Sequence, residues 1–103
     1  MVLPVYYTNA DTADTAVYTA PPTVRIVGLI LNISALLANT VRVATTSGAA
    51  PAAENWLEPG QVLTEGVVLE RTGVYLPAGH TVWIGSDTAN AVSVQIFGIE
   101  EAE

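Results

Sequence analysis

The chain has 103 residues and a formal net charge of −7, with three arginines, no lysine and no cysteine. This length predicts a single domain, and the missing cysteines exclude disulfides and thiolate chemistry. The negative charge argues against nucleic-acid binding, since such a surface repels phosphate backbones. No apolar run reaches the ~18 residues of a membrane span, and residues 1–14 lack the features of a secretory signal. We therefore expect neither a membrane span nor a secretory signal.

The shortage of charge is the second informative feature of the composition. Half of the residues are apolar and only 13% are charged, against about 25% in an average globular chain. A small soluble monomer has few charged groups here with which to cover its surface. We therefore expect other subunits to cover part of the apolar surface. The alternative is a monomer coated by its many Thr, Ser, Asn and Ala residues.

The first half of the chain predicts extended structure. Val, Thr and Ile together account for 32 residues of the whole chain, and branched side chains favour strands over helices. Residues 1–20 predict an extended arm or edge strand, because Pro4 cannot donate to a ladder. The strongest strand spans 23–34. Alternation there places Val24, Ile26, Gly28 and Ile30 on one face and Arg25, Val27, Leu29 and Leu31 on the other.

The second half predicts shorter strands between turns. Residues 34–39 form a connection, and a strand from Thr40 follows, with Val41 and Val43 inward. Residues 47–55 are a loop of small residues. Further turns are predicted at 58–61, with Pro59-Gly60 at the centre, and at 76–79. Strands over 80–86 and 91–100 complete the chain, and Val92, Val94 and Ile96 of the last strand face inward.

These elements define a fold class. Eight to ten short strands with no convincing helix predict an all-β, antiparallel β-sandwich of jelly-roll type, in one domain over residues 1–103. A small closed β-barrel is the alternative.

One stretch invites a catalytic interpretation. His80, the only histidine, stands near Ser86 and Asp87, and these residue types form a hydrolase triad when they touch. On an extended segment, however, the six positions from His80 to Ser86 separate their backbones by roughly 20 Å. No nucleophile elbow accompanies any serine. We interpret His80 as a partly solvated polar residue that opens a strand.

The remaining polar residues do not define a metal or cofactor site. One histidine and no cysteine argue against zinc. Asn9, Asp11 and Asp14 lie close together but lack the glycine and terminal glutamate of a calcium loop, so we interpret them as a solvated acidic loop. The acidic residues at 100–103 are interpreted as a frayed, soluble end. A glycosidase-type carboxylate pair stays open, because the sequence does not show spatial pairing. We predict a protein that is not an enzyme and needs no cofactor.

The strand alternation also places large apolar groups on the outer faces. Trp83 points away from the core if its neighbours point inward, and Phe97 and Ile99 do so on the last strand. Such groups usually mark a buried partner surface, with aromatic residues as anchors. We therefore predict an oligomer interface, formed by Val27, Leu29, Leu31, Trp83 and Phe97. The alternative is that the N-terminal arm of the same chain covers this surface.

The segment from Leu57 to Glu100 contains a turn-strand unit followed by a patterned final strand. The unit has Thr72, Gly73, Leu76, Gly79 and Val82, and the final strand has Ala89, Asn90, Val92, Val94, Gly98, Ile99 and Glu100. These residues resemble the "tG..L.aG..i" and "aN.vsv.v.GiE" motifs of small virion proteins of tailed bacteriophages. Residues 17–21 and 24–32 resemble the same proteins more loosely.

The resemblance implies a structural role. Small β-sandwich proteins of this kind often sit on phage heads as trimeric cement or decoration proteins, and others are tail, neck or head-fibre components. It implies a homo-oligomer, a trimer, that binds the major capsid protein or another virion protein and is located in the virion after synthesis in the host cytoplasm. We expect no nucleic-acid or membrane partner. A cement protein would stabilise the head through buried interface area and mass action.

Two other classes of function are weighed against this one. A carbohydrate-binding module is an alternative, because jelly rolls include lectin domains and Trp56, Trp83 and four tyrosines could stack on sugars. A small cupin-like enzyme is the other, and the missing histidine cluster argues against it.

Overall fold

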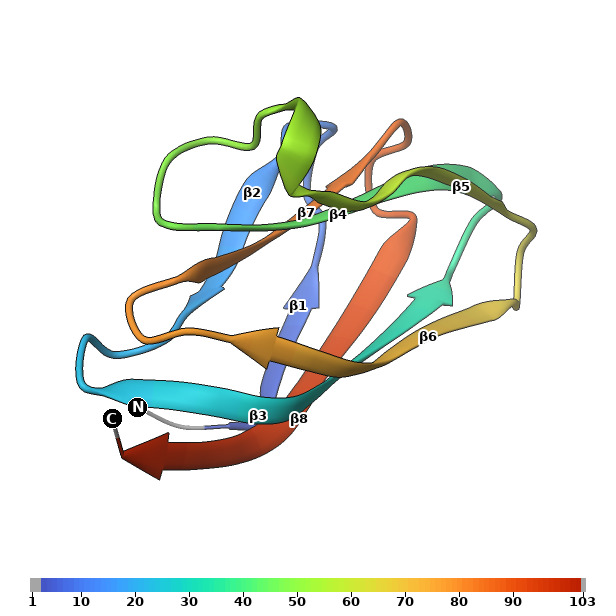
Figure 1. Ribbon diagram of the computed structural model, residues 1–103. Helices are drawn as coiled ribbons and strands as arrows, with labels where there is room; N and C mark the ends of the chain where they lie inside the picture. Colours follow the sequence, from blue (N-terminus) through green and yellow to red (C-terminus); the bar gives the residue numbers. More distant parts are fainter. Residues whose placement is uncertain (1–2, 103) are drawn as a thin grey trace.

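The computed structural model describes residues 3–102, which form eight β-strands and one short 3-10 helix (Figure 1). The elements in chain order are β1 (Val5–Thr8), β2 (Thr15–Thr19), β3 (Val24–Ala35), β4 (Asn39–Thr46), η1 (Ala53–Asn55), β5 (Trp56–Leu63), β6 (Val68–Leu76), β7 (Thr81–Ser86) and β8 (Val92–Ala102). Over this described range, no helix has the length and apolar character needed to cross a membrane.

The strands form two four-stranded antiparallel sheets that pack face to face (Figure 1). Their orders are β1-β8-β3-β6 and β2-β7-β4-β5. The pairs are nested: β1 with β8, β2 with β7, β3 with β6 and β4 with β5. A single long two-stranded ribbon folded onto itself gives this order, which is that of a jelly roll. The predicted β-sandwich is confirmed. The closed-barrel alternative is wrong, because β1, β6, β2 and β5 are free sheet edges.

The connections gather at the two ends of the sandwich. Loops 9–14, 36–38, 64–67 and 87–91 lie at one end, which we call the Leu36 end. Loops 20–23, 47–55 and 77–80 lie at the other, which we call the His80 end. This division follows from the antiparallel pairing, because consecutive strands run in opposite directions. Residues far apart in the chain therefore meet in two loop clusters.

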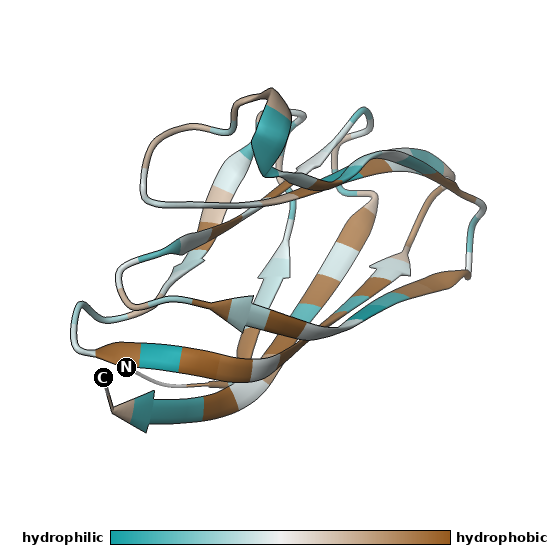
Figure 2. Cartoon of the chain, viewed as in Figure 1, coloured by the Kyte–Doolittle hydropathy of each residue, from teal (hydrophilic) through white to brown (hydrophobic). Residues whose placement is uncertain are grey.

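The core fills the space between the inner faces of the sheets. Its fully buried large side chains are Ile26, Leu29, Leu31, Ile33, Val41, Val43, Leu76, Val82, Ile84, Val92, Val94 and Ile96. The predicted inward positions on β4 and β8 are confirmed. Figure 2 shows the cause along β8, where hydrophobic and more polar residues alternate as the strand passes the core. Each such side chain contributes about 1.5–3 kcal/mol by leaving water.

A β-bulge at Gly28 changes which residues of β3 face the core. Gly28 has φ +61°, a left-handed conformation that glycine adopts without a steric penalty. The register of β3 shifts across it against both β6 and β8. Ile26 faces inward before the bulge, and Leu29 and Leu31 face inward after it. The prediction that Leu29 and Leu31 face outward is therefore wrong, whereas Val27, which precedes the bulge, does face outward.

The segment around Pro59 also differs from its expected structure. We expected a turn centred on Pro59-Gly60, but both residues lie inside the continuous strand β5. β5 is an edge strand that pairs only with β4, and its register shifts between Glu58 and Gln61. Proline is tolerated at such an irregularity of an edge strand. The turn after β6 does form: Gly79 has φ +77° and the His80 N–H donates to the Pro77 carbonyl at 3.0 Å.

Candidate functional site

The residues that first invited a catalytic interpretation lie apart. His80 precedes β7 at one end of the sandwich, whereas Ser86 ends β7 at the other. Ser86 is buried and its hydroxyl donates to Asn39 Oδ1 at 2.8 Å. Asp87 Oδ1 accepts the Thr40 N–H at 2.8 Å. These contacts tie the 87–91 loop to the start of β4 and leave Ser86 without a general base.

The pKa of Asp87 reflects this tying role. The Thr40 N–H, followed by the Thr88 hydroxyl, stabilises the carboxylate and lowers its pKa below the ordinary value of 3.8. Hydrogen bonds to the charged form lower a pKa in this way. The negative charge thus supports the loop structure at the Leu36 end.

Asn9 is the hub of that end, a role the sequence did not predict. It is 1% exposed. Its Oδ1 accepts the N–H groups of Ala91 and Val92 at 3.0 and 2.9 Å, and its Nδ2 donates to the carbonyls of Asp11 and Thr88 at 3.0 and 2.8 Å. All four bonds of the amide are thereby used. Only the position of Asn9, at the end of a strand, could have hinted at this.

The acidic loop after Asn9 is held by bonds within the protein. Asp11 Oδ1 accepts the Ala13 N–H at 3.0 Å, and Asp14 forms an ion pair with Arg42 at 2.9 Å. Within residues 3–102 there is no group of three or more His, Cys, Asp or Glu side chains placed to hold a metal ion. The oxygens of this loop therefore organise its own backbone.

The outer face of the sheet β1-β8-β3-β6 carries an apolar band, which we call the Phe97 face. Ile30 and Phe97 are cross-strand partners, as are Val27 and Ile99. Exposed Tyr6 and Tyr75 lie on the two edge strands of the same face, and Ile99 is 66% exposed. A band of this kind across one sheet is a feature of interaction surfaces.

The other sheet carries a second apolar feature, the Trp83 row. Its four cross-strand partners are Ala16 on β2, Trp83 on β7, Ala44 on β4 and Trp56 on β5. Ala44 points outward yet is fully buried, which fits its place between two indoles. Trp83 Nε1 donates to Thr46 Oγ1 at 3.0 Å, which fixes one indole over the sheet.

The structure separates the five predicted interface residues into three locations. Val27 and Phe97 lie together on the Phe97 face. Trp83 is half-buried on the opposite face of the sandwich. Leu29 and Leu31 lie inside the core and have no surface to offer a second copy. A single flat patch containing all five residues therefore does not exist.

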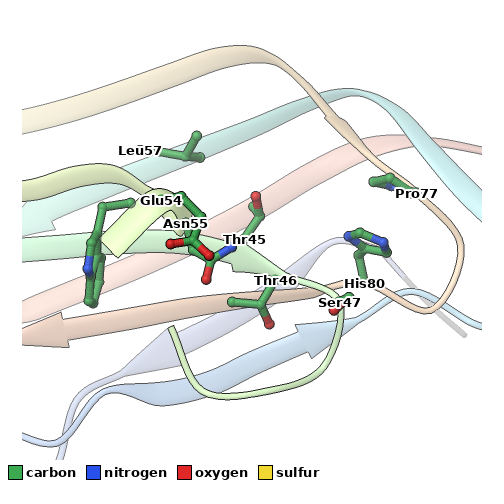
Figure 3. Close-up of a pocket in the computed structure, with 9 residues that line it drawn as sticks. Thr45, Thr46, Ser47, Glu54, Asn55, Leu57, Pro77 and His80 are labelled. Atoms are coloured by element: carbon green, nitrogen blue, oxygen red, sulfur yellow. The ribbon is translucent and has the colours of Figure 1, made fainter. Parts of the chain in front are cut away.

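A hollow opens at the His80 end of the sandwich. Its volume is about 480 Å³, and it is lined by Thr45, Thr46, Ser47, Glu54, Asn55, Trp56, Leu57, Pro77 and His80. Figure 3 shows Pro77 and His80 at one side, and Glu54 and Asn55 nearer the opposite side. The 47–55 loop and η1 supply much of this wall. One local signal could have indicated it: a loop of small residues followed at once by a tryptophan.

Comparisons of the chain with protein-family models, with curated proteins and with solved structures found no match. The geometry of the two outer faces and of the hollow is therefore the basis for any function.

Proposed function

We propose that the chain is a non-enzymatic structural protein of a phage virion, a capsid cement or decoration protein that stabilises the head as an oligomer. The observation that carries this proposal is the pair of apolar outer faces on a sandwich that is otherwise acidic and poor in charge. Apolar surface on both sides of a small domain favours burial against other proteins.

The two faces favour one mode of self-association. The Phe97 face and the Trp83 row lie on opposite sheets, so they are two different patches. When one patch of each copy contacts the other patch of the next, the contact is heterologous and closes into a ring if the rotation allows. A cyclic trimer, as the phage resemblance implies, is such a ring. Val27, Phe97 and Trp83 then all contribute to it, from opposite sides of the contact.

The residues of the phage-like motif support a relation in fold. Gly73, Gly79 and Asn90 have positive φ angles, and Leu76 and Val82 are fully buried. A Cβ at Gly98 would lie 2.5 Å from Ile26 Cγ2. Each of these motif positions is thus explained by a turn, by core packing or, for Gly73, by the irregular pairing of β6 with β3. The motif is therefore compatible with a shared fold, which supports the proposal, and it assigns no binding residue.

The charge distribution indicates the chemistry of a virion partner. All three arginines form ion pairs: Arg25 with Glu101, Arg42 with Asp14 and Arg71 with Glu58. Glu54, Glu65, Glu70 and Glu100 are exposed. The surface that meets the major capsid protein should accordingly be basic or neutral, because complementary charge favours encounter and correct pairing.

Sedimentation velocity at micromolar concentration tests the self-association. We expect the mass of three subunits for the wild type. Ile99→Glu and Trp83→Glu each place a charge on one face and should give monomers with native circular dichroism. Val67→Glu is the matched control, since Val67 is 42% exposed in the 64–67 loop and outside both faces. A monomeric wild type would refute the oligomer.

Mixing the two variants tests the heterologous arrangement. Ile99→Glu keeps an intact Trp83 row, and Trp83→Glu keeps an intact Phe97 face. The mixture should therefore form a one-to-one heterodimer, whereas an interface that pairs like faces gives no such rescue.

Pull-down against purified phage heads and tails tests the location. Retention on heads is expected for a cement protein. Retention on tails alone would move the assignment to a tail, neck or fibre component, and retention on neither would overturn the virion role.

A further inference from the structure

The hollow at the His80 end has an apolar side and a polar side. Trp56, Leu57 and Pro77 supply carbon surface, and the remaining lining residues supply hydroxyl, carboxylate, amide and imidazole groups. Trp56 stands where η1 passes directly into β5, so the sheet ladder fixes its backbone. Its volume of about 480 Å³ falls in the range of small-molecule sites, which are mostly apolar with a few placed polar groups.

Two polar residues of the hollow hold its wall in shape. Thr46 Oγ1 accepts the Gly48 N–H at 3.1 Å as well as the indole N–H of Trp83. Asn55 Oδ1 accepts the Ala52 N–H at 2.8 Å, across the single turn of η1. These bonds connect the 47–55 loop to β4 and to itself. The hollow is therefore formed by the protein alone, without a ligand to organise it.

Other polar groups of the hollow have no partner within the protein. Among residues 3–102, no hydrogen bond uses the side chains of Thr45, Ser47, Glu54, Trp56 or His80. Together they offer two hydroxyls, a carboxylate, an indole N–H and an imidazole. A preformed hollow thus presents one indole with donors and acceptors around it.

We infer that this hollow binds a neutral sugar ring of a glycan, with the ring against Trp56 and its hydroxyls on Glu54, His80 and Thr45. A pyranose has an apolar face of C–H groups, which suits the negative face of an indole, and a rim of hydroxyls, which both donate and accept. Trp56 lines the hollow and also belongs to the Trp83 row, so a sugar and a second copy would compete for it. The titration therefore uses the monomeric Ile99→Glu variant, in which the Trp83 row is intact and uncovered.

The charges of the hollow select a neutral ligand over an anionic one. Glu54 repels an anion, and His80 is the only lining residue able to carry positive charge. No arginine lines the hollow, and Arg71 is already engaged with Glu58. A quaternary ammonium is the competing ligand, since it would use both an aromatic face and a carboxylate. Such cations usually bind in cages of several aromatics, and this hollow has one.

The test is a titration of ¹⁵N-labelled protein with cellobiose, maltose, lactose and chitobiose, and separately with choline. The chain has two tryptophans, hence two indole N–H signals, which Trp83→Phe assigns. We expect at least one disaccharide to shift the Trp56 signal and to leave the Trp83 signal nearly in place. Trp56→Ala should weaken binding about tenfold or more, a loss of about 1.4 kcal/mol.

A second variant guards against misfolding of Trp56→Ala. Glu54→Gln keeps the size of an exposed side chain and should weaken sugar binding several-fold. Glu65→Gln is the matched control at the Leu36 end and should leave binding unchanged. Two outcomes would overturn the sugar assignment. One is saturable binding of choline, abolished by Glu54→Gln, with no binding of any disaccharide. The other is no shift of the Trp56 signal at 50 mM of each probe, a concentration on the order of 10²-fold above a sub-millimolar Kd.

Discussion

Replacing Asn9 by alanine removes the hub of the Leu36 end. The amide of Asn9 accepts the N–H groups of Ala91 and Val92, both of which are fully buried residues. In Asn9→Ala these two donors lose their acceptor while staying away from water. The two carbonyls bound by Nδ2 belong to loops and regain water more easily, so the buried donors dominate the loss.

The size of the effect follows from the two donors. A buried polar group left without a partner costs about 1–3 kcal/mol, so two of them predict a loss of about 3 kcal/mol or more. That is a large share of the ~5–15 kcal/mol that stabilises a typical domain. For a domain of this length each kcal/mol lowers Tm by about 4–8 °C, which gives a fall of about 12–24 °C.

Urea unfolding followed by circular dichroism measures the loss, with thermal unfolding as a second readout. The matched control is Asn32→Ala. Asn32 Oδ1 is buried with no partner among the described residues, so its removal leaves no donor without an acceptor. If Asn9→Ala lies within 1 kcal/mol of the wild type, or no lower than Asn32→Ala, the hub does not stabilise the loop cluster as reasoned.

Three further substitutions test other parts of the fold. Leu31→Ala should lower the unfolding free energy by about 2–5 kcal/mol in urea, because it opens a cavity in the core. Gly98→Ala should cost about 1–3 kcal/mol in the same assay, since the new Cβ would meet Ile26 Cγ2 at 2.5 Å. Asp87→Asn should destabilise the protein above pH 4 and progressively less in more acidic solution. The pKa of Asp87 is lowered in the folded protein. The stability that its carboxylate contributes is therefore present above the pKa of the unfolded state and is lost as pH falls through the pKa of the folded state.

Each of these has its control or opposing result. Val62→Ala, at an exposed position, should change stability by less than about 0.5 kcal/mol. Gly60→Ala places its Cβ 3.4 Å from Thr40 Cγ2, an ordinary contact, and should be nearly neutral. An Asp87→Asn effect of equal size at pH 7 and pH 2 would contradict the charge-based account, and an NMR titration of Asp87 with a pKa at or above 3.8 would do the same.

The fold class was predictable from local patterns, but which residues of β3 face the core was not. On β8 the alternation of Val92, Val94 and Ile96 agrees with their burial, because that stretch pairs without interruption. On β3 the bulge at Gly28 reverses the alternation. A glycine in a strand signals a bulge only weakly, since the conformation is set by pairing with β6 and β8 on both sides. Likewise, Pro59 forms a turn or an edge strand depending on its neighbours.

The candidate sites were predictable only in part. Trp83 and Phe97 were expected on outer faces, which the structure bears out, because period-two alternation decides that locally. Their positions on opposite sheets follow from the nested pairing, which joins distant segments. The hollow and the Asn9 hub depend on the same pairing. Trp56 and His80 line one hollow, and Asn9 Oδ1 accepts the Ala91 N–H, although the residues of each pair are far apart in the chain. No local pattern encodes such long-range proximity.

The nested ribbon has a consequence for synthesis. Val5 of β1 pairs with Ile96 of β8, so the first strand to leave the ribosome waits for the last. At about 5–20 residues per second that delay is roughly 5–20 s. Among the strands of residues 3–102, only β4 and β5 are adjacent in sequence and paired in space, so this hairpin is the natural place for pairing to start and spread outward. The sandwich is therefore complete only once β8 has been made, and the strands before β4 need protection until then.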